Sequence, residues 1–131
     1  AEFAAGGFVT VRDDATIAAA KAVRRVVCCT GKVYYDLLDA RGDDRSVALV
    51  RLELLYPFPA SAMQALRAKY AAAEFVWCQE EPANMGAWTF VRDRFPFASC
   101  SSRRAAASPA TGSSVKHKAE QAALVAAALA R

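Results

Sequence analysis

Three short segments of this sequence are almost continuously hydrophobic, and they limit the possible folds more than any other feature. They span residues 25–29, 47–55 and 74–79, and each is rich in β-branched or aromatic side chains. A strand that is apolar on both faces needs cover on both faces, as the strands of parallel sheets have. Helix-like segments separate the three, so we expect right-handed strand–helix–strand crossovers. The pattern predicts an α/β fold, a three-layer α/β/α sandwich.

Five segments have the spacing or the bordering residues typical of helices. They are residues 15–24, residues 32–40, a helix that begins near Pro59, a short helix after residues 84–86, and a last helix from Ser113 or Ser114 to the end of the chain. In the third, Met63, Leu66 and Tyr70 fall on one face. We also expect a first strand at residues 7–11 and a last edge strand around residues 104–107.

The length and composition fit one globular domain. The chain has 131 residues, of which 55% are hydrophobic and 23% charged, so it can bury a core. We treat residues 1–131 as a single domain, with the first strand within residues 1–14 and the C-terminal helix at residues 113–131. The net charge of +4 is mild, and no block of lysine and arginine exceeds a dipeptide, so we expect no nucleic-acid partner.

Neither a membrane span nor a disulfide framework is predicted. No apolar run approaches the roughly 18 residues that a membrane-spanning helix needs. The chain begins with Ala1 and has no signal-peptide pattern, so we expect a processed product or a part of something longer. Cys28 and Cys29 are adjacent and should point to opposite faces of a strand. With Cys78 and Cys100 they form no Cys-x-x-Cys pair, and buried, reduced thiols are expected.

Residues 28–32, Cys-Cys-Thr-Gly-Lys, lie at a predicted strand-to-helix turn and invite comparison with a phosphate-binding loop. That motif needs a glycine where this chain has Val26 and a hydroxyl where it has Val33, so the match fails. The free amides of the helix start could still hold an anion. The favoured interpretation is a tight turn in which Gly31 supplies backbone freedom and Lys32 is solvated.

Residues 79–82, Gln-Glu-Glu-Pro, follow the most apolar strand, where α/β sheets gather functional groups. Glu80 and Glu81 could form an acid–base pair, but adjacent carboxylates diverge. We therefore favour a role in accepting hydrogen bonds from loop amides or in capping the helix at residues 84–88. Trp77 and Trp88 flank this loop and are typical of core or interface filling.

His117 is the only histidine, and Glu120 lies one helical turn further on. Two ligands do not make a zinc site, so a solvated surface histidine is the better interpretation. The sequence has no Gly-x-Ser-x-Gly elbow and no Gly-x-Gly-x-x-Gly. On chemistry alone the chain reads as a domain that helps another domain to act.

Four strings carry a resemblance to a known family. They are VVCCTGKVYYDLL (26–38), VRLELLYPFP (50–59), FVWCQEEPANMGAW (75–88) and AAASPATG (105–112), followed by His117 and Glu120-Gln121. In this order they closely resemble the C-terminal domain of the 2-oxoglutarate dehydrogenase E1 component. The resemblance implies a transketolase C-terminal-like fold, with a five-stranded, mostly parallel sheet and one antiparallel edge strand at residues 7–11.

The resemblance also implies a context. The full-length enzyme of the tricarboxylic acid cycle is a thiamine-diphosphate-dependent homodimer that decarboxylates 2-oxoglutarate and passes the succinyl group to the lipoyl arm of the E2 component. Its diphosphate, magnesium and substrate sites belong to two preceding domains. We therefore expect this chain alone to be inactive and assign it no catalytic, cofactor-binding or metal-binding residue. In this family the C-terminal domain supports the dimer and the pyrimidine-binding domain.

The residues kept as structural or interface candidates come from the matching strings and the last helix. They are Gly31, Lys32, Tyr34, Gln79, Glu80, Glu81, Asn84, Gly86, Trp88, Leu124 and Val125. In the last helix, an apolar stripe at positions 115, 119, 122, 126 and 129 is expected to face the sheet. Leu124 or Val125 would then face outward and dock another domain or subunit.

Two departures from the family pattern stand out. Leu54 replaces the usual glutamine and no arginine pair follows Pro59, so the acetyl-CoA effector site of some bacterial relatives is not expected. The stretch between Phe95 and Arg104 is also shorter than usual, which suggests an altered sheet edge.

Three functional hypotheses stay open. The chain is a piece or split subunit of E1 that works beside the catalytic domains or a homodimer mate, or a free-standing domain kept as a structural subunit of an unrelated complex. The weakest alternative is a small-ligand module at the Gly31 turn. The family implies the mitochondrial matrix in a eukaryote, which we prefer, or the cytoplasm in a bacterium.

Overall fold

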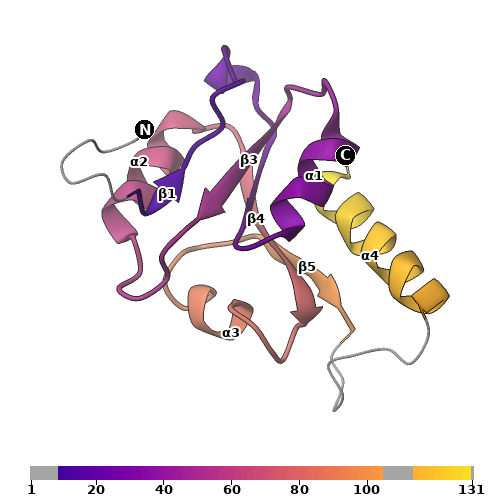
Figure 1. Cartoon of the computed structure of the whole chain (residues 1–131). Coiled ribbons are helices and arrows are strands. Elements are labelled where there is room, and N and C mark those ends of the chain that lie inside the picture. Colours follow the sequence, from indigo (N-terminus) through magenta and orange to yellow (C-terminus); the bar gives the residue numbers. More distant parts are fainter. Residues whose placement is uncertain (1–8, 105–113, 131) are drawn as a thin grey trace.

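The computed structural model describes residues 9–104 and 114–130. Its strands form one five-stranded sheet in the order β1-β3-β2-β4-β5 (Figure 1). Their bounds are β1 Val11–Arg12, β2 Arg25–Cys29, β3 Val47–Leu52, β4 Glu74–Pro82 and β5 Ser99–Arg103. β1 runs antiparallel to β3, and the other neighbours are parallel. The predicted α/β fold, with its mostly parallel sheet and antiparallel edge strand, is confirmed.

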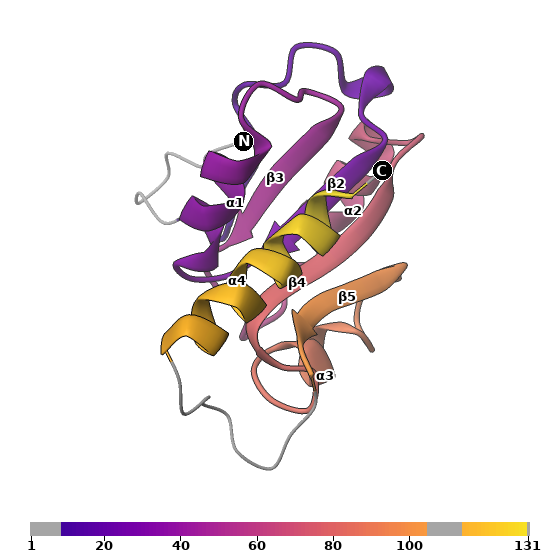
Figure 2. The same cartoon turned by 90° about the vertical axis from the view of Figure 1, so that its right-hand side faces the viewer.

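Helices cover both faces of the sheet and make three layers. α1 (Val33–Arg41) and α4 (Ser114–Leu129) lie on one face, as Figure 2 shows. α2 (Ala60–Lys69) and the short α3 (Trp88–Val91) pack on the other face. The predicted helices near residues 32–40, from Pro59, after residue 86 and at the C-terminus are confirmed, apart from Ser113, which lies outside the described residues.

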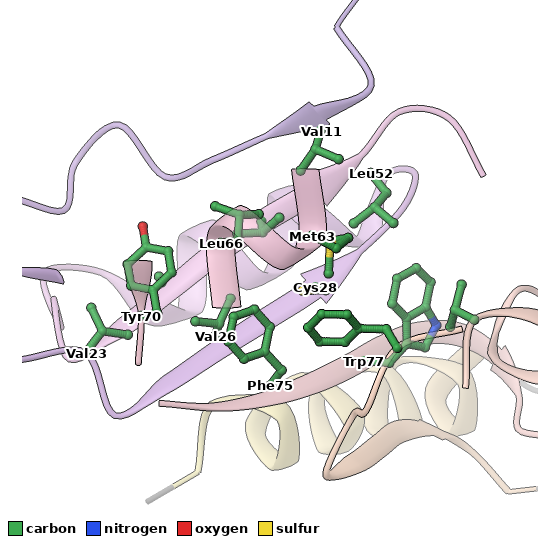
Figure 3. Close-up of a cluster of buried hydrophobic side chains, with 14 residues drawn as sticks. Val11, Val23, Val26, Cys28, Leu52, Met63, Leu66, Tyr70, Phe75 and Trp77 are labelled. Carbon is green, nitrogen blue, oxygen red and sulfur yellow. The ribbon is translucent and has the colours of Figure 1, made fainter. Parts of the chain in front are cut away.

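Each face has its own hydrophobic core, because neighbouring strand residues point to opposite sides. Cys28 belongs to the core under α2 and α3, together with Val26, Met63 and Trp77 (Figure 3). Cys29 belongs to the core under α1 and α4. The strands β2, β3 and β4 are therefore buried on both sides, as their continuous hydrophobicity predicts.

The predicted helix at residues 15–24 is wrong. Only one turn of 3₁₀ helix, η2 (Ala20–Ala22), forms there. Asp14 accepts hydrogen bonds from the amide and hydroxyl of Thr16 and fixes a turn, while Val23 inserts into the core. Alanine's helix propensity is a weak preference, and these tertiary contacts override it.

Three strand bounds also differ from expectation. β1 begins at Val11, and residues 7–8 of the predicted strand lie outside the described residues. β3 ends at Leu52 instead of residue 55, since the amides of Glu53 and Leu54 both turn to the carbonyl of Thr10. The last strand is β5 at residues 99–103 and not around 104–107, of which residues 105–107 lie outside the description. β5 is rich in serine, and pairing with β4 outweighs its weak strand propensity.

Candidate functional site

The carboxyl ends of β2 and β4 lie side by side in the middle of the sheet, and the chain leaves them toward opposite faces. β2 leads into α1 on one face, and β4 leads to α3 on the other. This arrangement is the topological switch point of an open α/β sheet, where functional groups usually gather. We therefore take this edge of the sheet as the candidate site.

Lys32 and Glu80 join the two strand ends across the switch point. The Lys32 Nζ donates to Glu80 Oε1 over 2.6 Å, although the lysine side chain is 80% exposed. This hydrogen bond raises the pKa of Lys32 above its ordinary value. The ammonium group already has a carboxylate partner, which weakens the anion hypothesis for this turn. Lys32 is exposed to solvent, as expected, and is in addition paired with Glu80.

The turn before α1 depends on Gly31. Its φ is +78°, a conformation that side-chain-bearing residues rarely adopt, so the predicted backbone freedom is confirmed. The preceding Thr30 donates its hydroxyl to the carbonyl of Leu52 over 2.8 Å, which ties the turn to the end of β3. Tyr34, in the first turn of α1, packs its ring against the guanidinium of Arg51 at 4.7 Å.

Gln79 organises the loop that follows β4. The side chain is 2% exposed, and its Oε1 accepts hydrogen bonds from the Trp77 indole at 3.0 Å and from the Trp88 amide at 2.8 Å. Its Nε2 lies 3.2, 2.9 and 2.8 Å from the carbonyl oxygens of Glu81, Pro82 and Met85. The loop carbonyls and the amide at the start of α3 are thus held by the side-chain amide of Gln79, whereas the sequence suggested the carboxylates of Glu80 and Glu81 for this role.

The remaining loop candidates shape the approach to α3. Gly86 has φ +66°, and a Cβ there would meet the side chain of Glu81 at 3.0 to 3.2 Å. Asn84 and Glu81 are exposed. Trp88 is half-buried, with its ring 6.1 Å from that of Phe97. The loop is a packed structural turn at which glycine is required.

A polar network ties the start of α4 to the same edge. Arg103, at the end of β5, donates to Gln121 Oε1 over 2.6 Å and to Glu120 Oε1 over 3.0 Å. Gln121 in turn donates to Asp36 and Glu80, each over 2.9 Å. Glu80 thus links α4 to the Lys32 pair. The polar side chains at the switch point satisfy one another.

His117 is exposed, as expected, and its carbonyl accepts a weak hydrogen bond from Arg103 at 3.4 Å. Within residues 9–104 and 114–130, no three His, Cys, Asp or Glu side chains are placed to hold a metal ion. In the same ranges, no helix is long and apolar enough to cross a membrane.

Comparison with known proteins places this sequence in a family. The family model described as 2-oxoglutarate dehydrogenase C-terminal matches residues 1–129. The chain belongs to this family. A 2-oxoglutarate dehydrogenase E1 component of Cupriavidus necator is 43% identical over 99% of this chain. Those of Rickettsia conorii and Brucella anthropi are 38% and 48% identical over 93% and 79% of it.

This 2-oxoglutarate dehydrogenase C-terminal domain spans only a small part of its relatives. It covers 15%, 14% and 12% of the lengths of those three E1 components. The resemblance seen in the four sequence strings is confirmed. Two of these strings, residues 26–38 and 75–88, form the two sides of the switch point.

The predicted outward position of Leu124 or Val125 is wrong. Both are buried against the sheet, with exposures of 4% and 5%, and Ala128 completes the buried stripe of the E1 domain's last helix. Val115, which we expected to face the sheet, is 76% exposed. Because α4 is rich in alanine, the expected stripe and the stripe that contains residues 124, 125 and 128 are both apolar. The larger side chains of Leu124 and Val125 decide that the second one packs against the sheet.

The far end of α4 is fixed by two arginines at the start of β2. Arg24 donates to the carbonyls of Leu129 and Ala130, and Arg25 to those of Ala127 and Ala128. The carbonyls of a last helical turn lack the usual partners of the helix interior, although that of Ala127 also accepts from the Ala130 amide over 3.4 Å, and the helix dipole favours cations at this end. The α4 helix of the E1 domain is therefore anchored at both ends.

The four cysteines are free thiols, and Cys28, Cys29 and Cys78 are buried as expected. Burial raises the pKa of Cys29 to about 12 and that of Cys100 to about 11. It also raises the pKa values of Cys28 and Cys78. The thiols stay protonated at neutral pH and are poor nucleophiles.

Sequence reasoning missed two clusters of the E1 domain. Asp14 and Arg41 form a buried ion pair, although the sequence around each of them is typical of an exposed segment. Arg51 stacks against Tyr34 and Tyr35, and it also pairs with Glu53 over 3.1 Å. Only the charge of Arg51 within an otherwise apolar strand could have drawn attention to the second cluster.

Proposed function

We propose that this chain is the non-catalytic C-terminal domain of a thiamine-diphosphate-dependent 2-oxoglutarate dehydrogenase E1 component, and that it supports the dimer and the catalytic domains. The match of residues 1–129 to the family carries the proposal. The domain acts beside domains that hold thiamine diphosphate, magnesium and substrate, in the mitochondrial matrix of a eukaryote or the cytoplasm of a bacterium.

The chemistry at the switch point supports a structural role. Lys32 is paired with Glu80. Both the Nε2 and the Oε1 of Gln79 form hydrogen bonds with the loop before α3 or with the first residue of that helix. A catalytic acid or base must be able to meet a substrate, whereas these groups are engaged with one another. Their bonds fix the relative positions of α1, α3 and α4, as a scaffold requires.

Titration calorimetry tests the proposal that this chain alone is not catalytic. We expect the isolated chain to show no saturable heat of binding with thiamine diphosphate and magnesium below about 100 μM, a threshold that corresponds to roughly 5 kcal/mol. Saturable binding below that concentration would contradict it, and decarboxylation of 2-oxoglutarate by the chain alone would do so as well.

A native mass measurement on the complex purified from its source tests the assembly part. The proposal expects this chain within, or bound to, a polypeptide that carries the catalytic domains, and together with lipoyl-bearing E2 subunits. The second candidate is a free-standing structural subunit of another complex, which is favoured by the departure from the family pattern between Phe95 and Arg104. Recovery only with proteins unrelated to E1 or E2 would establish that alternative.

A further inference from the structure

The outer face of α1 carries hydrophobic side chains that the domain leaves uncovered. Tyr35 and Leu38 are 59% and 38% exposed. They lie three residues apart on the helix and are therefore neighbours on its surface. Arg51, Glu53 and Arg12 continue this patch toward the edge of the sheet. We call these five residues the α1–β1 surface.

The α1–β1 surface is ordered by contacts within the domain. The guanidinium of Arg51 lies 5.6 Å from the Tyr35 ring centre and donates to the Tyr35 hydroxyl over 3.1 Å. Glu53 forms an ion pair with Arg51 over 3.1 Å and accepts a hydrogen bond from Arg12 over 3.1 Å. Tyrosine and arginine dominate the energetics of protein interfaces, and side chains already held in place lose less entropy on binding. An exposed apolar centre with a charged rim is typical of an interface.

The direction of β1 indicates what reaches this surface. β1 is antiparallel to β3, so the chain arrives at the carboxyl edge of the sheet and passes Glu53 before β1 begins. The amide of Glu53 donates to the carbonyl of Thr10 over 2.8 Å at that point. Figure 2 shows α1 over β3, on the side of the sheet away from β5. The incoming chain therefore runs beside the α1–β1 surface.

We infer that a preceding domain of the E1 polypeptide binds the α1–β1 surface, an inference that rests on the function proposed above. The family is a C-terminal one, and at least 85% of each of the three relatives lies outside the matched segment. The occupant is thus a preceding domain of the same chain. It presents an apolar pocket for Tyr35 and Leu38 and polar groups for the rim.

Photo-crosslinking in the full E1 polypeptide tests this. Tyr35→p-benzoylphenylalanine is expected to crosslink to the preceding domain of the same chain, and not only to the segment directly before β1, with isotope-mixed dimers separating links within a chain from links between chains. Gln64→p-benzoylphenylalanine, exposed on α2 at the opposite face, is the matched control and should not. Links only to a second copy or to another protein, or a yield no higher than that of the control, would overturn the inference.

Hydrogen exchange gives a second readout. In full E1, Tyr35→Ala with Leu38→Ala should speed exchange of the α1 amides about thirtyfold, the effect of losing one interface hot spot. Tyr35→Ala also removes the hydrogen bond from Arg51, so Tyr35→Phe, which loses that bond but keeps the ring, separates this contact from the interface. Gln64→Ala with Arg67→Ala on α2 serves as the control pair. Unchanged exchange in both pairs contradicts the inference.

The two proposals fail in different ways. If E1 assembles with its catalytic domains but the Tyr35 probe finds no preceding residue, the surface is wrongly assigned and the proposed function stands. If the natural polypeptide or complex contains no E1 catalytic domains, the proposed function fails first.

Discussion

The carboxylate of Asp14 accepts a hydrogen bond from the guanidinium of Arg41 inside the domain, where both side chains are almost fully buried. The same carboxylate oxygen accepts the Leu49 amide of β3 over 3.0 Å. β1 is only two residues long, so Asp14 takes the place of a neighbouring strand at that point of the edge. One ion pair thus joins the N-terminal segment, α1 and the sheet.

Removing one partner of this pair should strongly destabilise the domain. We expect Asp14→Ala to lower the free energy of unfolding by about 3 kcal/mol or more, since it leaves the Arg41 charge buried and unpaired. Asp39→Ala, at an exposed position of α1, should stay within about 0.5 kcal/mol. Urea denaturation of the two variants measures the difference, and equal midpoints would refute the role of the pair.

The pair should also make the domain sensitive to acid. Burial alone would raise the pKa of Asp14, but hydrogen bonds from Thr16, the Leu49 amide and Arg41 outweigh it and lower the pKa below its ordinary value of 3.8. A depressed folded-state pKa gives stability that is complete above the unfolded value and is lost as the pH falls through the folded one. Stability measured from pH 6 to pH 2 should fall below about pH 4, and less steeply in Asp14→Asn. A slope that Asp14→Asn leaves unchanged would assign the acid sensitivity to other groups.

Gln79→Glu should disrupt the loop before α3. The substitution replaces the Nε2 donor with an acceptor that faces three carbonyl oxygens, at a cost of about 1–3 kcal/mol for each unsatisfied buried group. Near-ultraviolet circular dichroism should change as well, because Trp77 and Trp88 both bond to this side chain. Gln64→Glu on the surface of α2 is the control. A native-like spectrum for Gln79→Glu would rule out the organising role.

Gly86→Val should destabilise the domain more than His117→Ala. Valine meets both a positive φ and the side chain of Glu81, which together cost of order 1–3 kcal/mol or more. His117 is exposed, so its replacement should change stability by less than about 0.5 kcal/mol. Adding Glu81→Ala to Gly86→Val should relieve the crowding but not the backbone strain, and denaturation should show only partial recovery. Similar losses for the two single variants would contradict this account.

Leu124→Glu should unfold α4 from the sheet, since Leu124 is 4% exposed in the core beneath α1 and α4. Burying an unpaired carboxylate there costs several kcal/mol. Ala123→Glu, the neighbouring exposed position, should leave both the fold and the helix content intact. Circular dichroism with thermal melting distinguishes them, and a folded Leu124→Glu variant would show that α4 does not need this contact.

The sequence predicts the centre of this fold well and its edges poorly. β2 and β4 are apolar on both faces, and the hydrophobic effect leaves such segments few alternatives to the middle of a covered sheet. β5, with three serines, is a strand only because β4 offers it hydrogen-bonding partners. The 15–24 segment is locally helical in composition, yet Asp14 and Val23 hold it in another shape through contacts that propensity does not contain.

The candidate site divides in the same way. The need for Gly31 and Gly86 follows from local backbone geometry, and both positions could be anticipated. The Gln79 bonds link it to residues up to nine positions away through a specific fold of the loop, so the adjacent glutamates looked equally suitable. The inward stripe of α4 depends on two large side chains among many alanines, which periodicity alone does not rank.

The place of α4 in the chain has a consequence for biosynthesis. As the ribosome delivers the domain, β2 and β4 emerge before the helix that covers Val27, Cys29 and Cys78 on one face. Arg24 and Arg25, which hold the last turn of α4, are synthesised about a hundred residues before the carbonyl groups that they bind. A nascent chain that ends before α4 therefore exposes the part of the core that α1 leaves uncovered, and it is the species on which chaperones and proteases should act.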